Sequence, residues 1–399
     1  MTSGLKLGIQ SMTSSKKDKT RLVHDGRTGA THHGAVNPPV YHASTFLYDS
    51  YLQVIGKEPG PEFFYGRHAT PTSDALEQAV CNLEGGFRTV LTPSGLNACA
   101  LSLLAFVETG DHVLLTDSAY QPSRDFCDTT LQRLGIDVTC FDPGSGAEIE
   151  RLITPKTKVI FLEAPGSQTM EIADMEQIVA VARAHDITTV IDNTWATPLF
   201  FKPLSIGIDV SIQAATKYFV GHADALIGTI TCNEKTYPQL RRLHRSFGIC
   251  AGPDDVRMAL RGLRTLEVRL AQHMHSAIEI AQWLEQQEVV QEVLHPALPS
   301  HPQHGLWQKL FTGSTGLFSF TIPPHSDEAL AAMLDNMEYF GMGFSWGGFE
   351  SLIMPYPHIV RETKPFPEDR LLIRLHIGLE DVSDLKHDLA QGFERLKTA

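Results

Sequence analysis

Three apolar stretches of strand length end in residues that could do chemistry. KVIFLEAP ends near Glu163, TTVIDN ends with Asp192 and Asn193, and VSIQAATKY ends near Lys217. A lysine or aspartate that stands alone in such a place is usually a solvated charge or a turn residue. Together these residues meet the needs of a pyridoxal cofactor, which requires an amine for its Schiff base and an acid that keeps its ring nitrogen protonated. We therefore predict that Lys217 binds pyridoxal 5'-phosphate covalently and that Asp192 pairs with the ring nitrogen.

A glycine-containing turn upstream could bind the cofactor phosphate. The segment PSGLNACAL places Ser94, Gly95 and Leu96 at the start of a helical pattern. The free N–H groups and the dipole at the start of a helix favour an anion. A Ser-Gly turn on its own is more typical of an ordinary loop. Its weight comes from its position, one strand–helix unit before the other site residues.

These residues require a sheet whose strands end side by side. From Thr72 onward, apolar stretches alternate with helical patterns, which is typical of parallel βαβ units. The first helix is expected to begin at Thr72 or Ser73 and to end at the Gly85-Gly86 pair. Strands with fully apolar centres are buried on both faces, as in a doubly wound sheet covered by helices. In such sheets ligands bind beyond the carboxyl ends of the strands.

The length of 399 residues favours two domains and a terminal arm. Residues 1–65 show little periodicity, and we expect an arm of the kind that wraps a partner subunit. Residues 66–262 are predicted to form a large cofactor-binding domain, and residues 263–399 a smaller C-terminal α+β domain. A long helical pattern over about 253 to 287 is expected to connect the two domains.

Composition excludes several classes of partner. The net charge of −13 repels nucleic-acid phosphates and anionic lipid, so we expect neither nucleic acid nor membrane as a partner. No apolar run is long enough to span a bilayer, and the polar first residues lack the apolar core of a secretory signal. The histidines lack carboxylate or cysteine partners at ligand spacing, so no metal is assigned. The six scattered cysteines are interpreted as buried thiols: Cys81, Cys99, Cys127, Cys140, Cys232 and Cys250. Together these features predict a cytoplasmic protein.

The chain resembles the pyridoxal-phosphate enzymes of cysteine and methionine metabolism, from about residue 20 to 396. The most specific match is DVSIQAATKYFVGHADALIGTI, which is similar to the cofactor-lysine signature of that family with Lys217 in the Schiff-base position. Other matching stretches are FFYGRHATPTSDALEQAVCNLEGG, LLTDSAYQPSRDF, FLEAPGSQTMEI, VIDNTWATP, ALRGLRTLEVRL and HIGLEDVSDL. The resemblance implies an α/β fold of the aspartate-aminotransferase type (fold type I), with a mainly parallel central sheet.

The resemblance also implies roles for individual residues. Tyr120 would stack on the cofactor ring and help to deprotonate the incoming substrate amine. Arg374 would bind the substrate α-carboxylate as a bidentate fork. Cofactor contacts are implied for Lys217, Asp192, Tyr120, Gly95, Leu96 and Thr216, and, from a neighbouring subunit, for Tyr65 and Arg67.

One position departs from the family pattern. Many relatives have Ser where this chain has Ala214, two residues before Thr216. The site would lose one hydroxyl contact to the phosphate. More of the phosphate binding would then depend on backbone groups and Arg67.

The substrate side has to decide which reaction is catalysed, because members of the family share one cofactor site. Relatives that act at Cγ commonly carry Glu in an ESLGG-like stretch, since their chemistry also removes a proton from Cβ. Here FSWGG has Phe344 at that position, and Phe cannot accept a proton. The stretch is similar to that of bacterial β-lyases of the family. This implies β-elimination of L-cystathionine to L-homocysteine, pyruvate and ammonia, with substrate contacts from Arg374, Ser345, Trp346, Tyr65 and Phe344.

Several alternatives stay open at this stage. Another cysteine-conjugate β-lyase, a cysteine desulfhydrase or a γ-lyase of the same family would carry the same lysine signature. A non-catalytic regulator that binds the cofactor is disfavoured, because Lys217, Asp192, Tyr120 and Arg374 are all present. If Tyr65 and Arg67 complete a neighbour's site, the smallest active unit is a homodimer, and we expect dimers to pair into a tetramer.

Overall fold

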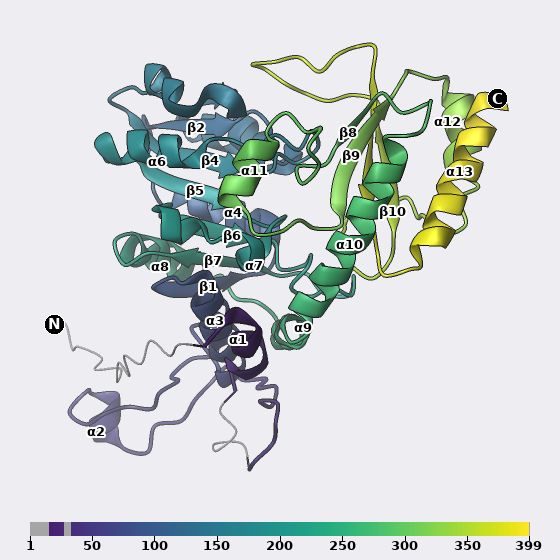
Figure 1. Cartoon of the computed structure of the whole chain (residues 1–399). Helices are drawn as coiled ribbons and strands as arrows, with labels where there is room; N and C mark the ends of the chain where they lie inside the picture. The colour runs from purple at the N-terminus through teal and green to yellow at the C-terminus, as the bar shows by residue number, and fades with distance from the viewer. Residues whose placement is uncertain (1–15, 28–32, 399) are drawn as a thin grey trace.

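A seven-stranded sheet forms the centre of the larger part of the molecule. The computed structural model describes residues 16–27 and 33–398. The strands lie in the order β1-β7-β6-β5-β4-β2-β3 (Figure 1), where they are β1 (Arg88–Thr92), β2 (His112–Thr116), β3 (Asp137–Phe141), β4 (Thr157–Glu163), β5 (Thr188–Asp192), β6 (Val210–Gln213) and β7 (Gly228–Cys232). Five neighbouring strands, from β6 to β3, run parallel, while β7 is antiparallel to β1 and β6. The expected mainly parallel sheet is confirmed.

Helices cover both faces of this sheet. In β2, Val113 and Leu115 join a hydrophobic cluster with α4 (Gly95–Leu104), whereas Leu114 joins a second cluster with α6 (Met175–Ala184). Successive side chains of a strand point to opposite faces, so β2 contributes to both clusters. The fully apolar strand centres follow from this burial on two sides.

The first helix of this part, α3 (Pro71–Glu84), begins slightly earlier than predicted. Thr70 is its N-cap, and the side chains of Thr70 and Ser73 each accept a hydrogen bond from the other residue's backbone N–H. This capping box satisfies two N–H groups that the helix leaves free, and it fixes the start at Pro71. The predicted end is confirmed, because Gly85 closes the helix in the left-handed conformation. The remaining helical segments are α5 (Gln121–Asp125), a π-helical turn (Phe126–Leu131), two 3₁₀ segments (Pro143–Leu152 and Pro203–Ile206), α7 (Thr197–Phe200) and α8 (Tyr237–Ser246).

Two helices, rather than one, lead from the large sheet to the rest of the chain. α9 (Pro253–Leu263) and α10 (Leu266–Leu284) are separated at Arg264 and Thr265, so the continuous helix suggested by the sequence pattern is wrong. The Arg264 side chain donates to the carbonyl oxygens of Leu22 at 2.6 Å and Asp25 at 2.8 Å. The break therefore coincides with the point where the N-terminal helix docks.

A four-stranded antiparallel sheet forms the centre of the smaller part. Its order is β10-β11-β9-β8, with β8 (Glu292–Leu294), β9 (Leu317–Ile322), β10 (Leu352–Tyr356) and β11 (Leu371–His376). Phe318 and Phe320 of β9 and Ile373 of β11 pack into one hydrophobic cluster with α10. Figure 1 shows this sheet in green and yellow, beside α10 and apart from the large sheet. The other helices are α11 (His304–Leu310), α12 (Asp327–Leu334) and α13 (Val382–Thr398).

The N-terminal segment lies at one end of the large sheet. Helix α1 (Asp18–His24) packs against α3, with Leu22 buried between them. The chain around α2 (Tyr51–Val54) extends away from the sheet (Figure 1) and carries exposed apolar side chains, among them Val36, Leu47 and Tyr51. Residues 1–15 and 28–32 of the predicted 1–65 arm lie outside the described residues. The boundaries of the arm and the two domains remain predictions.

The structure also bears on two predictions made from composition, the absence of a membrane span and the burial of the cysteines. In the parts of the chain that the structure describes, no helix is both long and apolar enough to cross a membrane. Five of the six cysteines are buried, but Cys250 is exposed. The prediction that all six thiols are buried is therefore wrong for Cys250, which follows the short helix α8 in a connecting loop.

Candidate active site

Six of the eight predicted cofactor residues meet in a cavity of about 330 Å³ at the carboxyl ends of the strands. The ends of β4 and β5 and the start of α4 form one side, and residues 344–346 from the smaller part form the other. This is where the strand ends of an open α/β sheet place ligands. The residues that line the cavity include Gly95, Leu96, Cys99, Tyr120, Glu163, Asp192, Thr194, Thr216, Lys217, Phe344, Ser345 and Trp346.

Lys217 follows β6 and reaches into this cavity. Its Nζ donates to Oγ of Ser345 at 2.9 Å and lies 5.2 Å from the centre of the Trp346 ring. Burial lowers the pKa of Lys217 to about 8, and the nearby positive charge of Arg374 acts in the same direction. At pH 7 roughly a tenth of the amine is therefore uncharged, and this form can act as a nucleophile or a base.

Asp192 ends β5 and is 8% exposed. Its Oδ1 accepts hydrogen bonds from the Thr194 backbone N–H at 3.0 Å and from the Thr194 hydroxyl at 2.5 Å. Its Oδ2 lies 3.7 Å from the thiol of Cys99 in α4. Burial raises the pKa of Asp192, while the Thr194 donors, Cys99 and the positive charge of Lys217 oppose that shift. Thr194 and Cys99 were not among the predicted site residues.

The start of α4 opens into the same cavity. Ser94 is the N-cap and its hydroxyl accepts from the N–H of Asn97 at 3.1 Å, so Gly95 and Leu96 occupy the first two helical positions. N–H groups at these positions have no partner within a helix. A Cβ atom on Gly95 would come within 2.4 Å of the Cβ of Ala214, so only glycine fits here. The helix start is thus held directly against the strand end that precedes Lys217.

Thr216 faces the cavity, but its hydroxyl already has protein partners. Its Oγ1 accepts from the N–H of Ile227 at 2.9 Å and donates to the Ile227 carbonyl oxygen at 3.2 Å. A hydroxyl oxygen has two lone pairs and can rotate its proton. Contact with a phosphate would therefore require the hydroxyl to give up the Ile227 carbonyl.

Tyr120 lies at the mouth of the cavity and is 43% exposed. It is the residue before α5, and its backbone N–H donates to Oε2 of Glu163 at 2.7 Å. Burial raises the pKa of its phenol, and the neighbouring Cys99, Glu163 and Asp192 side chains contribute to the same shift. The sequence pattern placed Glu163 at a strand end, but it did not predict the contact between Glu163 and Tyr120.

Arg374 is in the central strand of the smaller sheet, β11, and is 7% exposed. Its Nη2 donates to the carbonyl oxygen of Phe344 at 3.0 Å, and its Cζ lies 5.3 Å from the centre of the Tyr356 ring. Arg374 does not itself line the cavity. It lies next to the Phe344–Trp346 wall and electrostatically lowers the pKa of Lys217.

Tyr65 and Arg67 are not brought to the Lys217 cavity within one chain. They line a separate cavity of about 410 Å³, formed with residues 41–44 and 249–251. Arg67 donates to the carbonyl oxygen of Arg245 at 3.1 Å, and its Cζ lies 5.5 Å from the centre of the Tyr65 ring. Their predicted role in a neighbouring subunit's site remains a prediction.

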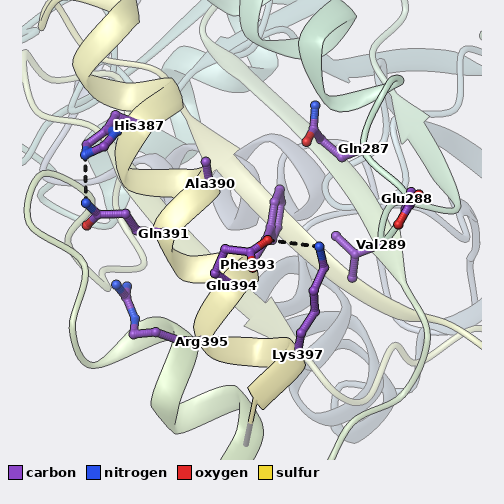
Figure 2. A pocket seen from close by; sticks show the side chains of 10 residues that line it. All are labelled: Gln287, Glu288, Val289, His387, Ala390, Gln391, Phe393, Glu394, Arg395 and Lys397. Carbon is purple, nitrogen blue, oxygen red and sulfur yellow. Dashed lines mark hydrogen bonds and ion pairs between the residues drawn. The ribbon is translucent and has the colours of Figure 1, made fainter.

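Another hollow, on the outer side of the smaller part, contains none of the predicted site residues. Figure 2 shows it between α13 and residues 287–289, with a hydrogen bond between His387 and Gln391 and an ion pair between Glu394 and Lys397. The cavity lacks the combination of strand ends and a helix start that surrounds Lys217. Among residues 16–27 and 33–398, no group of three or more His, Cys, Asp or Glu side chains is placed to hold a metal ion.

The Lys217 cavity fits pyridoxal 5'-phosphate. Three features of this cavity support the fit. Lys217 is an amine with a lowered pKa, and Asp192 is a buried acid with three hydrogen-bond donors nearby. The third feature is the start of α4, where Gly95 lies against Ala214. These groups match the aldehyde, the ring nitrogen and the phosphate of that cofactor. Lys217, Asp192, Gly95 and Leu96 would hold it.

Comparison with known proteins agrees with this chemistry. Residues 19–394 match the model of the family described as Cys/Met metabolism PLP-dependent enzyme. The chain belongs to this family. It is therefore a PLP-dependent enzyme, as the lysine and aspartate predicted.

Named relatives cover almost the whole chain. Cystathionine β-lyase of Escherichia coli (strain K12) is 48% identical over 391 residues, which is 96% of this chain and 99% of the relative. A putative cystathionine β-lyase of Rhizobium johnstonii is 47% identical, covering 94% of this chain and 95% of the relative. An L-alanine/L-glutamate racemase of Wolbachia pipientis is 39% identical, covering 95% of this chain and 98% of the relative.

Solved structures of the same architecture share less sequence. Cystathionine γ-lyase from Lactobacillus plantarum, complexed with L-serine, has a TM-score of 0.88 at 28% identity, covering 96% of this chain and all of that chain. Cystathionine γ-synthase from Xanthomonas oryzae pv. oryzae, in complex with aminoacrylate and cysteine, has a TM-score of 0.88 at 30% identity and the same coverage. The predicted fold type is confirmed.

Proposed function

We propose that this protein is a cystathionine β-lyase, a carbon–sulfur lyase that converts L-cystathionine and water to L-homocysteine, pyruvate and ammonia. The observation that carries the proposal is the wall opposite the sheet, where Phe344, Ser345 and Trp346 face the cavity around Lys217. This wall offers a phenyl ring, a hydroxyl and an indole, and none of these can take a second proton from Cβ as chemistry at Cγ requires. The cavity's carboxyl groups, Glu163 and Asp192, are on the sheet side.

The relatives support the same choice. The E. coli and Rhizobium proteins, at 48% and 47% identity, are named for β-lyase activity. The γ-lyase and γ-synthase structures share the fold at 28% and 30% identity. The alternative functions are therefore less favoured: a γ-lyase, another cysteine-conjugate β-lyase or cysteine desulfhydrase, and a non-catalytic regulator that binds the cofactor.

When bound, the cofactor supplies a protonated ring that accepts electrons from the substrate's Cα. The chain's own groups supply the proton transfers. We assign Lys217 as the base that takes the Cα proton and returns it to the departing sulfur. Its pKa of about 8 lets the amine act in both directions near neutral pH. The Ser345 hydroxyl, 2.9 Å from Nζ, holds the amine on the side of the substrate wall.

Other groups orient the reactants. Arg374 is proposed to bind the substrate carboxylate through its guanidinium, with Tyr356 beneath it. Tyr120 is proposed to cover the cofactor ring and to accept a proton from the incoming amine. Asp192 is proposed to keep the ring nitrogen protonated, because an ionised carboxylate stabilises a neighbouring positive charge.

We further propose a cytoplasmic homo-oligomer. Within one chain Tyr65 and Arg67 stand apart from Lys217, and the segment that carries them exposes several apolar side chains. A second chain that covers this segment would explain both observations. The dimer is then the smallest active unit, and pairing of dimers into a tetramer is the expected assembly.

Product identification tests the proposed reaction. L-cystathionine is incubated with the enzyme and the keto acid is identified by chromatography. Pyruvate with homocysteine is the expected outcome. If 2-oxobutyrate with cysteine is the main product, the β-lyase proposal is wrong while the family assignment stands.

A second candidate activity is racemisation of a small amino acid. It is favoured by the Wolbachia relative named L-alanine/L-glutamate racemase, at 39% identity. Elimination and racemisation share removal of the Cα proton, and racemisation needs only its return to the opposite face. Formation of D-alanine from L-alanine, measured with a chiral column, would establish it as an additional activity. If no D-alanine forms under conditions in which pyruvate is released from L-cystathionine, this candidate is excluded.

A further inference from the structure

Two carboxyl groups share one wall of the cavity. Glu163, the last residue of β4, is paired in register with Asp192, the last residue of β5, and both line the cavity. Paired residues of neighbouring parallel strands point to the same face of a sheet. The two acids are therefore neighbours, and Asp192 is buried while Glu163 is half-buried. Two neighbouring carboxyl groups do not both ionise easily, because their negative charges would repel each other.

Asp192 has one more hydrogen-bond donor nearby than Glu163. Asp192 receives the N–H and the hydroxyl of Thr194 and lies near the Cys99 thiol. Glu163 receives the backbone N–H of Tyr120 at 2.7 Å and the Ser167 hydroxyl. Donors that point at a carboxylate favour its ionised form. Asp192 also has the positive charge of Lys217 nearby. The arrangement thus favours charge on Asp192.

Arg361, a positive group that acts on Glu163, is already engaged elsewhere. Arg361, from the loop between β10 and β11, lies 3.1 Å from both carboxylate oxygens of Glu171. The other titratable groups that face Glu163 are Asp192, Tyr120 and Cys99. Burial raises the pKa of Glu163 well above its usual value, and the charge of Asp192 adds to the shift.

We propose that Glu163 holds a proton in the working enzyme and acts as a neutral positioning residue for Tyr120, leaving Asp192 as the cavity's single carboxylate. This inference rests on the proposed function. A protonated carboxyl group still accepts the Tyr120 N–H through one oxygen and carries its proton on the other. The N–H contact fixes the backbone from which the Tyr120 ring extends over the cavity.

The protonation state matters for the substrate as well as for Tyr120. An ionised Glu163 would repel the Asp192 carboxylate and could accept a proton from a neighbouring group. It would also repel the carboxylate of an incoming amino acid. A neutral Glu163 avoids both effects while keeping the same contact.

Two substitutions separate the charge of Glu163 from its hydrogen bond. Glu163→Gln keeps a neutral group with an acceptor oxygen, so we expect kcat/KM within about threefold of wild type and an unchanged pH profile. Glu163→Leu removes the acceptor, and we expect kcat to fall about tenfold with a smaller change in KM, since one buried donor is left unpaired. If Glu163→Gln instead shifts the pH profile and lowers kcat/KM by about 100-fold, the charge is required and the proposal is wrong.

Infrared difference spectroscopy of the holoenzyme detects the protonated carboxyl group of Glu163 directly. At neutral pH the wild type should show a carbonyl band of a protonated carboxylic acid that Glu163→Gln lacks, beyond any band from Glu77 and Glu84, whose pKa values burial raises to about 8 and about 7. The matched control is Glu150→Gln, which removes an exposed carboxylate that pairs with His185 and should leave the band in place. Absence of the band in the wild type, or wild-type kcat in Glu163→Leu, would overturn the proposal. The infrared result does not depend on turnover, so it remains informative even if the proposed reaction is wrong.

Discussion

The Nζ of Lys217 donates a hydrogen bond to Oγ of Ser345 across the boundary between the two parts of the chain, at 2.9 Å. Lys217 follows the large sheet, whereas Ser345 precedes the strand β10 of the smaller sheet. The contact gives the flexible lysine side chain a fixed position next to Trp346. The serine thereby connects the cofactor side of the cavity to the substrate side.

Replacing this serine should slow catalysis and shift its pH dependence. Ser345→Ala removes an acceptor that stabilises the ammonium form, so the pKa of Lys217 should fall below about 8. A lower pKa leaves the amine uncharged at lower pH, and the acid limb of the kcat profile should therefore move to lower pH. We expect kcat to fall about tenfold, because the amine is less well held. Ser345→Thr, which keeps the hydroxyl, is the control; an unchanged profile in Ser345→Ala would show that the contact has no role.

The cofactor should be attached to Lys217 and to no other lysine. Reduction of the holoenzyme with borohydride should fix it there, as peptide mass spectrometry can show. Lys217→Ala should retain the cofactor only noncovalently and lose turnover, since the binding amine and the base are removed together. Lys235→Ala, which changes an exposed lysine paired with Asp186, is the control and should behave as wild type. Label on a different lysine would refute the assignment.

Tyr356 should help to hold the substrate-binding arginine. Its ring lies 5.3 Å from the guanidinium carbon of Arg374, and a cation over an aromatic face is stabilised by about 1 kcal/mol. Tyr356→Leu should therefore raise KM about fivefold with a smaller effect on kcat. Tyr356→Phe keeps the ring and should stay near wild type. Equal KM values in Tyr356→Leu and the wild type would mean that the Phe344 carbonyl alone positions Arg374.

Mixed oligomers test whether Tyr65 and Arg67 serve a neighbouring site. Lys217→Ala and Arg67→Ala should each be inactive or nearly so. In a hybrid dimer one site carries both lesions and the other is intact, so random mixing should restore about one quarter of wild-type activity. Pairing Lys217→Ala with the double variant Lys217→Ala/Arg67→Ala is the control and should restore none. If mass spectrometry shows hybrids but activity does not recover, the shared site is excluded.

Much of the site followed from the sequence because parallel strands impose order. Once three apolar strands were identified, their ends had to meet at one edge, which brings Glu163, Asp192 and Lys217 into one cavity. The glycine turn at Gly95 was predictable for the same reason, since a helix start that contacts a strand end needs a residue without Cβ. Local rules also gave the end of α3 at Gly85.

The rest depends on contacts between segments far apart in the chain. The Thr194 and Cys99 donors to Asp192 come from a loop and a helix whose packing no local pattern specifies. The break between α9 and α10 lies where Arg264 binds the N-terminal helix, so the periodicity of the helical pattern alone could not locate it. The Glu163–Tyr120 contact likewise joins two strand–helix units.

The aromatic wall should determine that elimination occurs at Cβ. Phe344 is 76% exposed in the single chain, lines the cavity, and contributes the carbonyl oxygen that Arg374 binds. Phe344→Glu places a carboxylate near Lys217 and Arg374. An opposite charge raises the pKa of a lysine, so the amine would be protonated at pH values where the wild type has free base. The acid limb of the kcat profile should therefore move to higher pH.

The same substitution should also weaken substrate binding. The introduced carboxylate competes with the substrate carboxylate for Arg374, so kcat/KM for L-cystathionine should fall about tenfold or more, as measured by pyruvate release. Phe344→Leu is the matched control, because it keeps an apolar side chain and the same backbone carbonyl, and should retain activity within about threefold. Traces of 2-oxobutyrate from Phe344→Glu would fit the addition of a base within reach of Cβ. Wild-type kcat/KM in Phe344→Glu would show that the aromatic wall does not contribute to the reaction.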